Sequence, residues 1–118
     1  MHKIILEDIK IFAYHGVYND EIKNGQNFYL SIEYKQEFNS DLHKDSISSV
    51  LDYAVLIKDI KIKFNEKRYM LIEALGNDLF NYLIEKYNFF YLKLIIKKDN
   101  EKLNRTLKNI IIEIESEK

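Results

Sequence analysis

Four positions in the sequence carry side chains suited to acid–base or binding chemistry. Glu21 lies in a polar stretch rich in glycine and asparagine, and Glu73 lies in an apolar segment where a helix could start. Lys98 follows Lys97 at the end of an apolar run, and Tyr53 lies where another helix could start. Each of these positions also has an ordinary structural explanation, such as helix capping or a solvated charge. No single one of them indicates a function.

Several common kinds of catalytic site are missing from the sequence. The chain has no Cys, which excludes thiol chemistry, disulfide bonds and cysteine-ligated metals. Its three histidines, His2, His15 and His43, have no spacing typical of a zinc site, so we expect no metal. Three glycines cannot form a dinucleotide-binding or phosphate-binding loop, so we expect no nucleotide cofactor. Acid–base chemistry by carboxylate, lysine and tyrosine side chains remains.

Length, composition and charge narrow the class of protein. The 118 residues suit one domain, and 47% hydrophobic with 31% charged residues is typical of a folded globular chain. A formal net charge of -1 gives no general attraction to nucleic acid. The N-terminal apolar segment is too short for a signal-peptide core or a membrane span. We therefore expect a single cytoplasmic domain over residues 1–118 that binds neither nucleic acid nor a membrane.

Alternating hydrophobicity predicts four strands. The first two cover residues 3–14 and 27–38 and form a hairpin, with a loop over residues 19–25 between them. An aromatic and β-branched run over residues 89–96 predicts a third strand. The alternation that begins at residue 110 predicts a fourth strand, which continues to the end of the chain.

Apolar residues at helical spacing predict two helices between the second and third strands. Asp52 is the predicted N-cap of a helix from Tyr53 to Phe64, and a second helix is predicted from Ile72 to about Tyr87. The polar stretches 39–49 and 99–108 are predicted connections.

The predicted order, β-β-α-α-β-β, indicates an α+β fold. Hairpins at both ends favour a four-stranded antiparallel sheet with both helices packed on one face. Aromatic residues occur on both faces of the strands, so we expect an uncovered face that is apolar enough to need a partner. Edge strands also present backbone groups that another subunit could satisfy. We therefore expect a homo-oligomer that forms through the sheet.

Taken with their flanking residues, the four positions form a wider pattern. The segment from Ile9 to Gln26 reads I-K-I-F-A-Y-H-G-V, followed by Glu21 and then Gly-Gln. Leu51-Asp52-Tyr53-Ala54 and Leu71-Ile72-Glu73-Ala74-Leu75 form two further blocks. Lys98 follows Glu73 by 98 − 73 = 25 residues. In this combination the sequence resembles the dihydroneopterin aldolase family of folate biosynthesis along nearly the whole chain.

The resemblance implies the tunnelling fold and a retro-aldol reaction. The reaction cleaves 7,8-dihydroneopterin into 6-hydroxymethyl-7,8-dihydropterin and glycolaldehyde. The resemblance also implies that Glu73 and the backbone of Ile72 hold the pterin ring and that Glu21 binds the hydroxylated side chain of the substrate. Lys98 would be the general base, and Tyr53 would line the pocket or assist proton transfer. The imine of the substrate would accept the electrons, so no metal, cofactor or lysine Schiff base would be needed.

The resemblance also implies an assembly. Family members commonly form ring-shaped tetramers, whose sheets close into a barrel and which stack as octamers. Their sites lie between subunits, so Tyr53 would reach the site from a neighbouring subunit.

Several alternatives stay open from the sequence. An epimerase on the same fold could act on dihydroneopterin or its triphosphate, and a noncatalytic interaction module is a more distant possibility. Lys97 could replace Lys98 as the base. A lysine in water is almost fully protonated at pH 7, so Lys98 either loses its proton through burial or polarises a water molecule.

Overall fold

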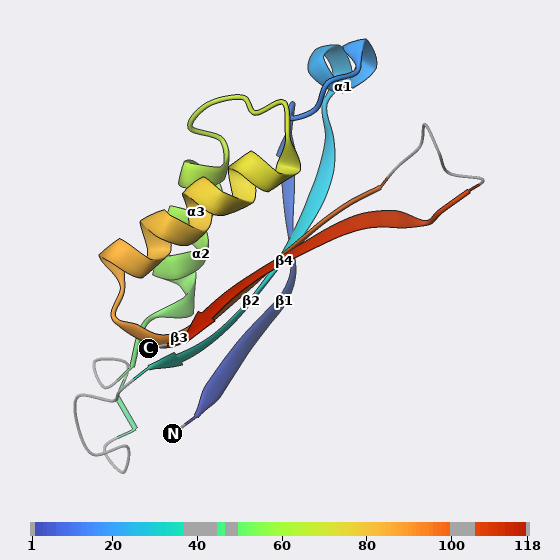
Figure 1. Cartoon of the computed structure of the whole chain (residues 1–118). Helices are drawn as coiled ribbons and strands as arrows, with labels where there is room; N and C mark the ends of the chain where they lie inside the picture. Colours follow the sequence, from blue (N-terminus) through green and yellow to red (C-terminus); the bar gives the residue numbers. More distant parts are fainter. Residues whose placement is uncertain (1, 37–44, 47–49, 100–105, 118) are drawn as a thin grey trace.

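A four-stranded antiparallel sheet, covered on one face by two helices, forms the framework of the molecule (Figure 1). The computed structural model describes residues 2–36, 45–46, 50–99 and 106–117. The strands are β1 Lys3–Ala13, β2 Gln26–Gln36, β3 Phe89–Asp99 and β4 Asn109–Glu117. The helices are α1 Asn19–Asn24, α2 Tyr53–Phe64 and α3 Ile72–Lys86. The predicted α+β order is confirmed, and α1 is an additional helix. Most residues of the predicted connections 39–49 and 99–108 lie outside the described residues.

The order of the strands in the sheet is β1-β2-β3-β4. Lys98 of β3 lies opposite Phe28 of β2, and Lys97 lies opposite Tyr29. Phe28 is fully buried beneath the helices. Because side chains alternate along a strand, Lys98 shares the helix-covered face with Phe28, whereas Lys97 lies on the uncovered face. The register therefore separates two lysines that are adjacent in the sequence.

A β-bulge keeps both halves of β1 facing the core. The register with β2 shifts between Leu6 and Ile9, where β1 has one residue more than its partner. Asp8 takes a φ of 55°, and its backbone N–H donates to Ser31 Oγ at 3.0 Å. Without the extra residue, the alternation would turn either Leu6 or Ile9 away from the helices.

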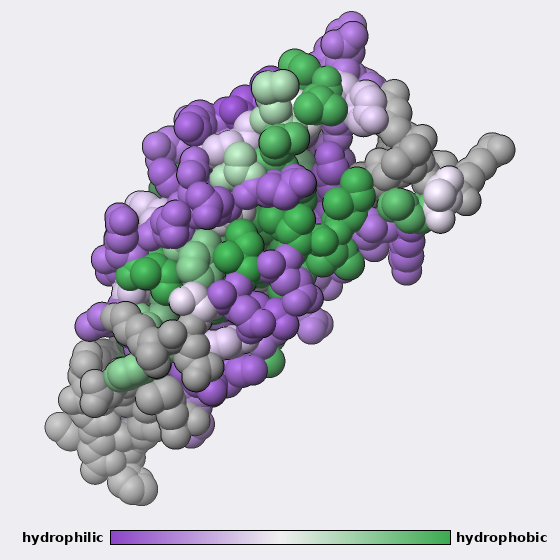
Figure 2. Space-filling model, in the orientation of Figure 1, coloured by the Kyte–Doolittle hydropathy of each residue, from purple (hydrophilic) through white to green (hydrophobic). Residues whose placement is uncertain are grey.

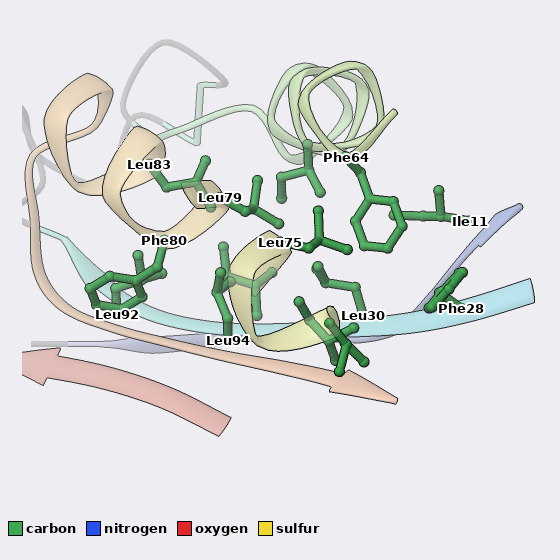
Figure 3. Packing of buried hydrophobic residues seen from close by; sticks show 14 of the residues in the cluster. Ile11, Phe28, Leu30, Phe64, Leu75, Leu79, Phe80, Leu83, Leu92 and Leu94 are labelled. Atoms are coloured by element: carbon green, nitrogen blue, oxygen red, sulfur yellow. The ribbon is translucent and has the colours of Figure 1, made fainter. Parts of the chain in front are cut away.

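The core lies between the sheet and the two long helices. Figure 3 shows Leu75, Leu79 and Leu83 of α3 packed over side chains of the sheet, with Phe64 of α2 beside them. Each of these four side chains is at most 1% exposed. Burial of each one contributes about 1.5–3 kcal/mol to stability.

The two long helices begin at opposite ends of the sheet. Asp52 caps α2 as predicted, because its Oδ1 accepts a hydrogen bond from the N–H of Ala54 at 2.9 Å. α2 then runs to Phe64, and α3 starts at Ile72 close to that end and returns along the sheet (Figure 1). The start of α3 and the start of α2 are therefore separated by the length of a helix.

The uncovered face is mixed, because charged side chains lie there beside exposed apolar residues. Two ion pairs join neighbouring strands across it, Lys3–Glu33 at 3.3 Å and Lys93–Glu113 at 3.4 Å. The same face carries exposed apolar residues on the edge strands: Ile5 of β1, opposite Glu33, is 54% exposed, and Ile111 of β4, opposite Lys97, is 52% exposed. Figure 2 shows hydrophobic residues gathered along β4 and the adjoining side of α3. The edges are thus the apolar surfaces available for contact with another subunit.

Candidate active site

Glu21 and Lys98 form an ion pair at one end of the sheet, although they are 77 residues apart in the sequence. Lys98 Nζ lies 3.1 Å from Glu21 Oε2, and each side chain is only 14% exposed. Gln26 Nε2 donates to the same oxygen at 2.8 Å, and the backbone N–H of Tyr18 donates to Glu21 Oε1 at 3.1 Å. A carboxylate offers about four acceptor positions, so these three donors leave roughly one for a ligand.

The donors around Glu21 determine its charge. Burial alone would raise the pKa of Glu21, but the hydrogen bonds from Gln26, Tyr18 and Lys98 outweigh burial and lower the pKa below 4.5, its ordinary value. Glu21 is therefore ionised at neutral pH. It can accept a hydrogen bond from a hydroxyl group of a ligand.

Glu21 lies on the short helix α1, in a segment whose sequence predicts a loop. Glu21 is the third residue of α1 and reaches back to the N–H of Tyr18, just before the helix. Gly25 ends α1 with a φ of 69°. Acidic residues in the first turn and a glycine after the last residue are the sequence signals of such a helix. A helix of six residues is too short for hydrophobic periodicity to reveal it.

Gly16 makes room for the carboxylate of Glu21. The φ of Gly16 is 141°, a backbone conformation that residues with a Cβ rarely adopt. A Cβ at this position would lie 2.4 Å from both Cδ and Oε1 of Glu21. The close approach of backbone and carboxylate therefore requires glycine.

We expect Gly16→Ala to displace Glu21 and to break its contact with Lys98. Turnover should fall by roughly tenfold or more, the scale of a misplaced polar group at a reacting centre. Gly76→Ala is the matched control, because its Cβ would meet only the ends of the isoleucine side chains Ile96, Ile112 and Ile114. Steady-state kinetics and urea unfolding of both variants measure the effect. Wild-type turnover in Gly16→Ala would show that the position of Glu21 does not matter.

His15 joins the end of β1 to the connection between α2 and α3. The side chain is 3% exposed, and its Nδ1 accepts from the N–H of Tyr69 at 3.0 Å. Nε2 therefore carries the proton and donates to the carbonyl oxygen of Phe64, 2.9 Å away. The N–H of Gly16 donates to the carbonyl oxygen of Tyr69 at 2.9 Å. Tyr69 lies just before α3, so these bonds fix the start of the helix that carries Glu73.

Sequence reasoning gave His15 no role of its own. The residue entered as part of the Tyr-His-Gly segment and as a histidine without zinc-site spacing, because nothing local shows that its imidazole will meet residues about 50 positions later. Burial lowers the pKa of His15, the charge of Arg68 adds to this effect, and the hydrogen bond to Phe64 opposes it. The net pKa lies below 6.5, its ordinary value. The neutral imidazole is the form that the fold requires.

Stability should consequently depend on pH through His15. The folded state disfavours the protonated imidazole, whereas the unfolded chain takes up the proton as the pH falls through about 6.5. We expect the free energy of unfolding to fall below that pH and this contribution to be constant above it. Urea unfolding at pH 7.5 and pH 5.5 measures the change. His15→Gln should be less stable but should lose this part of the pH dependence; an unchanged pH dependence in that variant would contradict the assignment.

Ile72 and Glu73 begin α3, at the same end of the sheet as the Glu21–Lys98 pair (Figure 1). Ile72 is 7% exposed, whereas the side chain of Glu73 is exposed. The first N–H groups of a helix have no partner within the helix. Leu71, just before α3, is 54% exposed. This end of the molecule therefore offers an exposed carboxylate, backbone donors and apolar surface together.

Tyr53 does not join the other predicted site residues within one chain. It begins α2 and lines a pocket together with Tyr34 of β2. Lys98 lies opposite Phe28, which is 34 − 28 = 6 residues from Tyr34 along the same strand. At about 3.3 Å per residue, this separation is roughly 20 Å. A site that contains both Tyr53 and Lys98 requires two chains.

The part of the chain that the structure describes contains no cluster of three or more His, Asp or Glu side chains that could hold a metal ion. None of the described helices is long and apolar enough to cross a membrane.

The chemistry at the Glu21–Lys98 end is that of an ion pair beside a helix start. Such a site suits a polar ligand whose hydroxyl groups can donate to a carboxylate.

Comparison with known proteins gives consistent matches. A family model described as FolB, dihydroneopterin aldolase, matches residues 4–115. A dihydroneopterin aldolase of Streptococcus pyogenes serotype M18 is 24% identical over 119 residues, which covers 100% of both chains. One of Staphylococcus epidermidis is 28% identical over 112 residues, covering 94% of this chain and 93% of its own.

Solved structures show the same fold. The FolB structure from Vibrio cholerae has a TM-score of 0.85 at 21% identity and covers 100% of this chain and 98% of its own. The E. coli dihydroneopterin aldolase, solved in complex with neopterin, has a TM-score of 0.79 at 20% identity, with 98% and 99% covered. The tunnelling-fold prediction is confirmed by these likenesses. Since the family model also spans nearly the whole sequence, the chain belongs to the FolB dihydroneopterin aldolase family.

Proposed function

We propose that this chain cleaves 7,8-dihydroneopterin in a site shared by two subunits, without a metal ion and without a lysine Schiff base. Dihydroneopterin aldolase activity in folate biosynthesis follows from family membership; the proposal concerns the residues and the mechanism. The observation that carries the proposal is the partly buried ion pair of Glu21 and Lys98, at the same end of the sheet as the start of α3. We also propose a cytoplasmic location.

Recognition of the ring is assigned to the start of α3. The E. coli relative was solved with neopterin and a Burkholderia relative with guanine, which has the same amino-substituted, amide-containing ring edge as a pterin. The Glu73 carboxylate would accept two parallel hydrogen bonds from the amino group and the adjacent ring N–H, with the backbone of Ile72 beside it. Hydrogen bonds to a charged group contribute about 1.5–3 kcal/mol each.

Bond cleavage is assigned to the Glu21–Lys98 pair. A base removes the proton from the hydroxyl on the second side-chain carbon, and the bond between the first and second side-chain carbons breaks. The electron pair moves into the ring imine to give an enamine, and the two-carbon fragment leaves as glycolaldehyde. Returning a proton to the first side-chain carbon gives 6-hydroxymethyl-7,8-dihydropterin. Glu21 would hold a side-chain hydroxyl group in place during this step.

The ion pair favours one of the two routes for Lys98. Lys98 Nζ donates to Glu21 Oε2 at 3.1 Å, which leaves its other N–H groups to hold a water molecule. We therefore favour the route in which Lys98 polarises a water molecule, and that water transfers the proton.

Tyr53 completes the site from a second subunit. The separation of roughly 20 Å within one chain supports this arrangement. In this arrangement, the end of one subunit that carries Tyr53 contacts the end of the next subunit that carries Lys98. The two surfaces are unlike, and contacts between unlike surfaces generate a ring when the rotation between subunits closes. The apolar edges of β1 and β4 are suitable for joining the sheets into a barrel. A tetramer or a stacked octamer is the assembly we expect.

The products of the purified protein test the proposed reaction. With 7,8-dihydroneopterin as substrate, we expect glycolaldehyde and 6-hydroxymethyl-7,8-dihydropterin in equal amounts. An epimerase would return an isomer that retains its three-carbon side chain. A noncatalytic module would return the substrate unchanged. Either of these two outcomes would overturn the proposal.

The metal-free mechanism makes a separate prediction. Exhaustive chelation should leave turnover unchanged, because the proposed electron acceptor is the imine of the substrate. Borohydride added during turnover should leave the mass of the protein unchanged, because no Schiff base forms with Lys98 or Lys97. Loss of activity that zinc restores, or a pterin-derived or aldehyde-derived mass on a lysine, would contradict this mechanism.

A further inference from the structure

The hydroxyl group of Tyr34 is buried without a hydrogen-bond partner among the described residues. The side chain is 1% exposed, and its ring packs against Phe89 with the ring centroids 4.9 Å apart. A buried hydroxyl without a partner lowers stability. A phenylalanine would make the same ring contact without this cost. A buried polar group of this kind therefore needs an explanation.

Tyr34 and Tyr53 line the same pocket, at the end of the sheet remote from Lys98. The space in it for solvent is about 20 Å³, which admits one water molecule and is far too small for a pterin ring. The other lining residues are His2, Ile4, Gln36, Val50 and Leu51. The pocket therefore suits a bridging water between polar side chains.

Tyr34 and Tyr53 interact electrostatically beside this pocket. Burial raises the pKa of Tyr34 to about 12, and the charge of an ionised Tyr53 contributes to the increase. Tyr34 therefore keeps its proton at neutral pH and is available as a hydrogen-bond donor. Tyr53 is 45% exposed, so little packing restricts its ring in a single chain.

We propose that Tyr34 is a positioning residue for Tyr53, whose hydroxyl it orients by a hydrogen bond through one water molecule in this pocket. The inference rests on the proposed function, in which Tyr53 enters the site of a neighbouring subunit. An exposed tyrosine must lose side-chain freedom when it meets a substrate. A hydrogen bond from Tyr34 restricts that freedom beforehand, so the site is organised before the substrate arrives.

Tyr87 provides a contrast within the same core. Its hydroxyl donates to Asp59 Oδ2 at 2.8 Å, and its ring stacks on Phe89, the residue that also contacts Tyr34. A hydroxyl with such a partner supports the fold. Tyr87→Phe should therefore lower the free energy of unfolding, whereas Tyr34→Phe should leave it unchanged or raise it.

A double-mutant cycle tests the proposal with the full-length protein and 7,8-dihydroneopterin. Tyr34→Phe should lower kcat by roughly fivefold to tenfold, with a small change in KM. Tyr53→Phe should lower kcat further, and Tyr34→Phe combined with Tyr53→Phe should be no slower than Tyr53→Phe alone. This non-additivity is expected because Tyr34 acts only through the hydroxyl of Tyr53.

Three outcomes would overturn the assignment while leaving aldolase activity intact in the wild type. These are wild-type kinetics in Tyr34→Phe, additive losses in the cycle, and a loss of stability in Tyr34→Phe as large as that in Tyr87→Phe. Absence of activity in the wild type is a different result: it would refute the proposed function and, with it, the role of Tyr34.

Discussion

Glu73→Ala is expected to weaken the binding of neopterin at least about a hundredfold. The substitution removes both charge-assisted hydrogen bonds to the ring, a loss of about 3 kcal/mol or more. Because the Glu73 side chain is exposed, the fold should be unaffected. Titration calorimetry with neopterin measures the affinity, and urea unfolding checks the stability.

Glu85→Ala is the matched control for Glu73. Glu85 is an exposed acid on the same helix, near its opposite end. Wild-type affinity is expected in this variant. If both variants bind neopterin as the wild type does, α3 does not hold the ring and the assignment of Glu73 is wrong.

Lys98→Ala is expected to separate chemistry from binding. It removes the group that activates the proton transfer, so turnover should fall by roughly a hundredfold or more. Affinity for neopterin should fall only modestly, because Glu73 is untouched. Glu21 keeps its hydrogen bonds from Gln26 and Tyr18, so its carboxylate should stay in place. Single-turnover kinetics and calorimetry distinguish the two effects.

Lys97→Ala is the internal control for Lys98. Lys97 lies on the uncovered face, where its Nζ is 3.5 Å from Asp8 Oδ1, so turnover should stay close to that of the wild type. The reverse pattern, with Lys97 essential and Lys98 dispensable, would place the base on the uncovered face of the sheet and contradict the assignment of Lys98. If neither lysine matters, the mechanism assigned to this site fails.

Most of the fold follows from patterns that are local in the sequence. Alternation over β2 and the helical spacing of Leu75, Leu79 and Leu83 each show which residues face the core, so the strands, both long helices and the Asp52 cap could be predicted. The bulge at Asp8 could not be predicted, because its register depends on the partner strand. The ion pairs on the uncovered face could not be predicted, because they form between side chains on different strands.

The site is less accessible to sequence reasoning than the fold. The family pattern singled out Glu21 and Lys98, but their contact depends on α1 and on the register of two strands. His15 was missed because its partners, Phe64 at the end of α2 and Tyr69 in the connection after it, lie about 50 residues away in the sequence. Spacing also cannot show that Tyr53 and Lys98 lie beside opposite parts of β2, at Tyr34 and Phe28 respectively. These facts arise from packing between distant segments.

Mixing of inactive subunits tests the shared site most directly. Lys98→Ala and Tyr53→Ala would be co-expressed with different tags, and oligomers that carry both tags would be purified and assayed for glycolaldehyde release. If each site combines Lys98 of one subunit with Tyr53 of the next, about a quarter of the sites in randomly mixed rings contain both residues. The account therefore predicts recovery of about a quarter of the wild-type turnover. Mixed oligomers as inactive as the two parent variants would contradict it, because they would place both residues in a site formed by one chain.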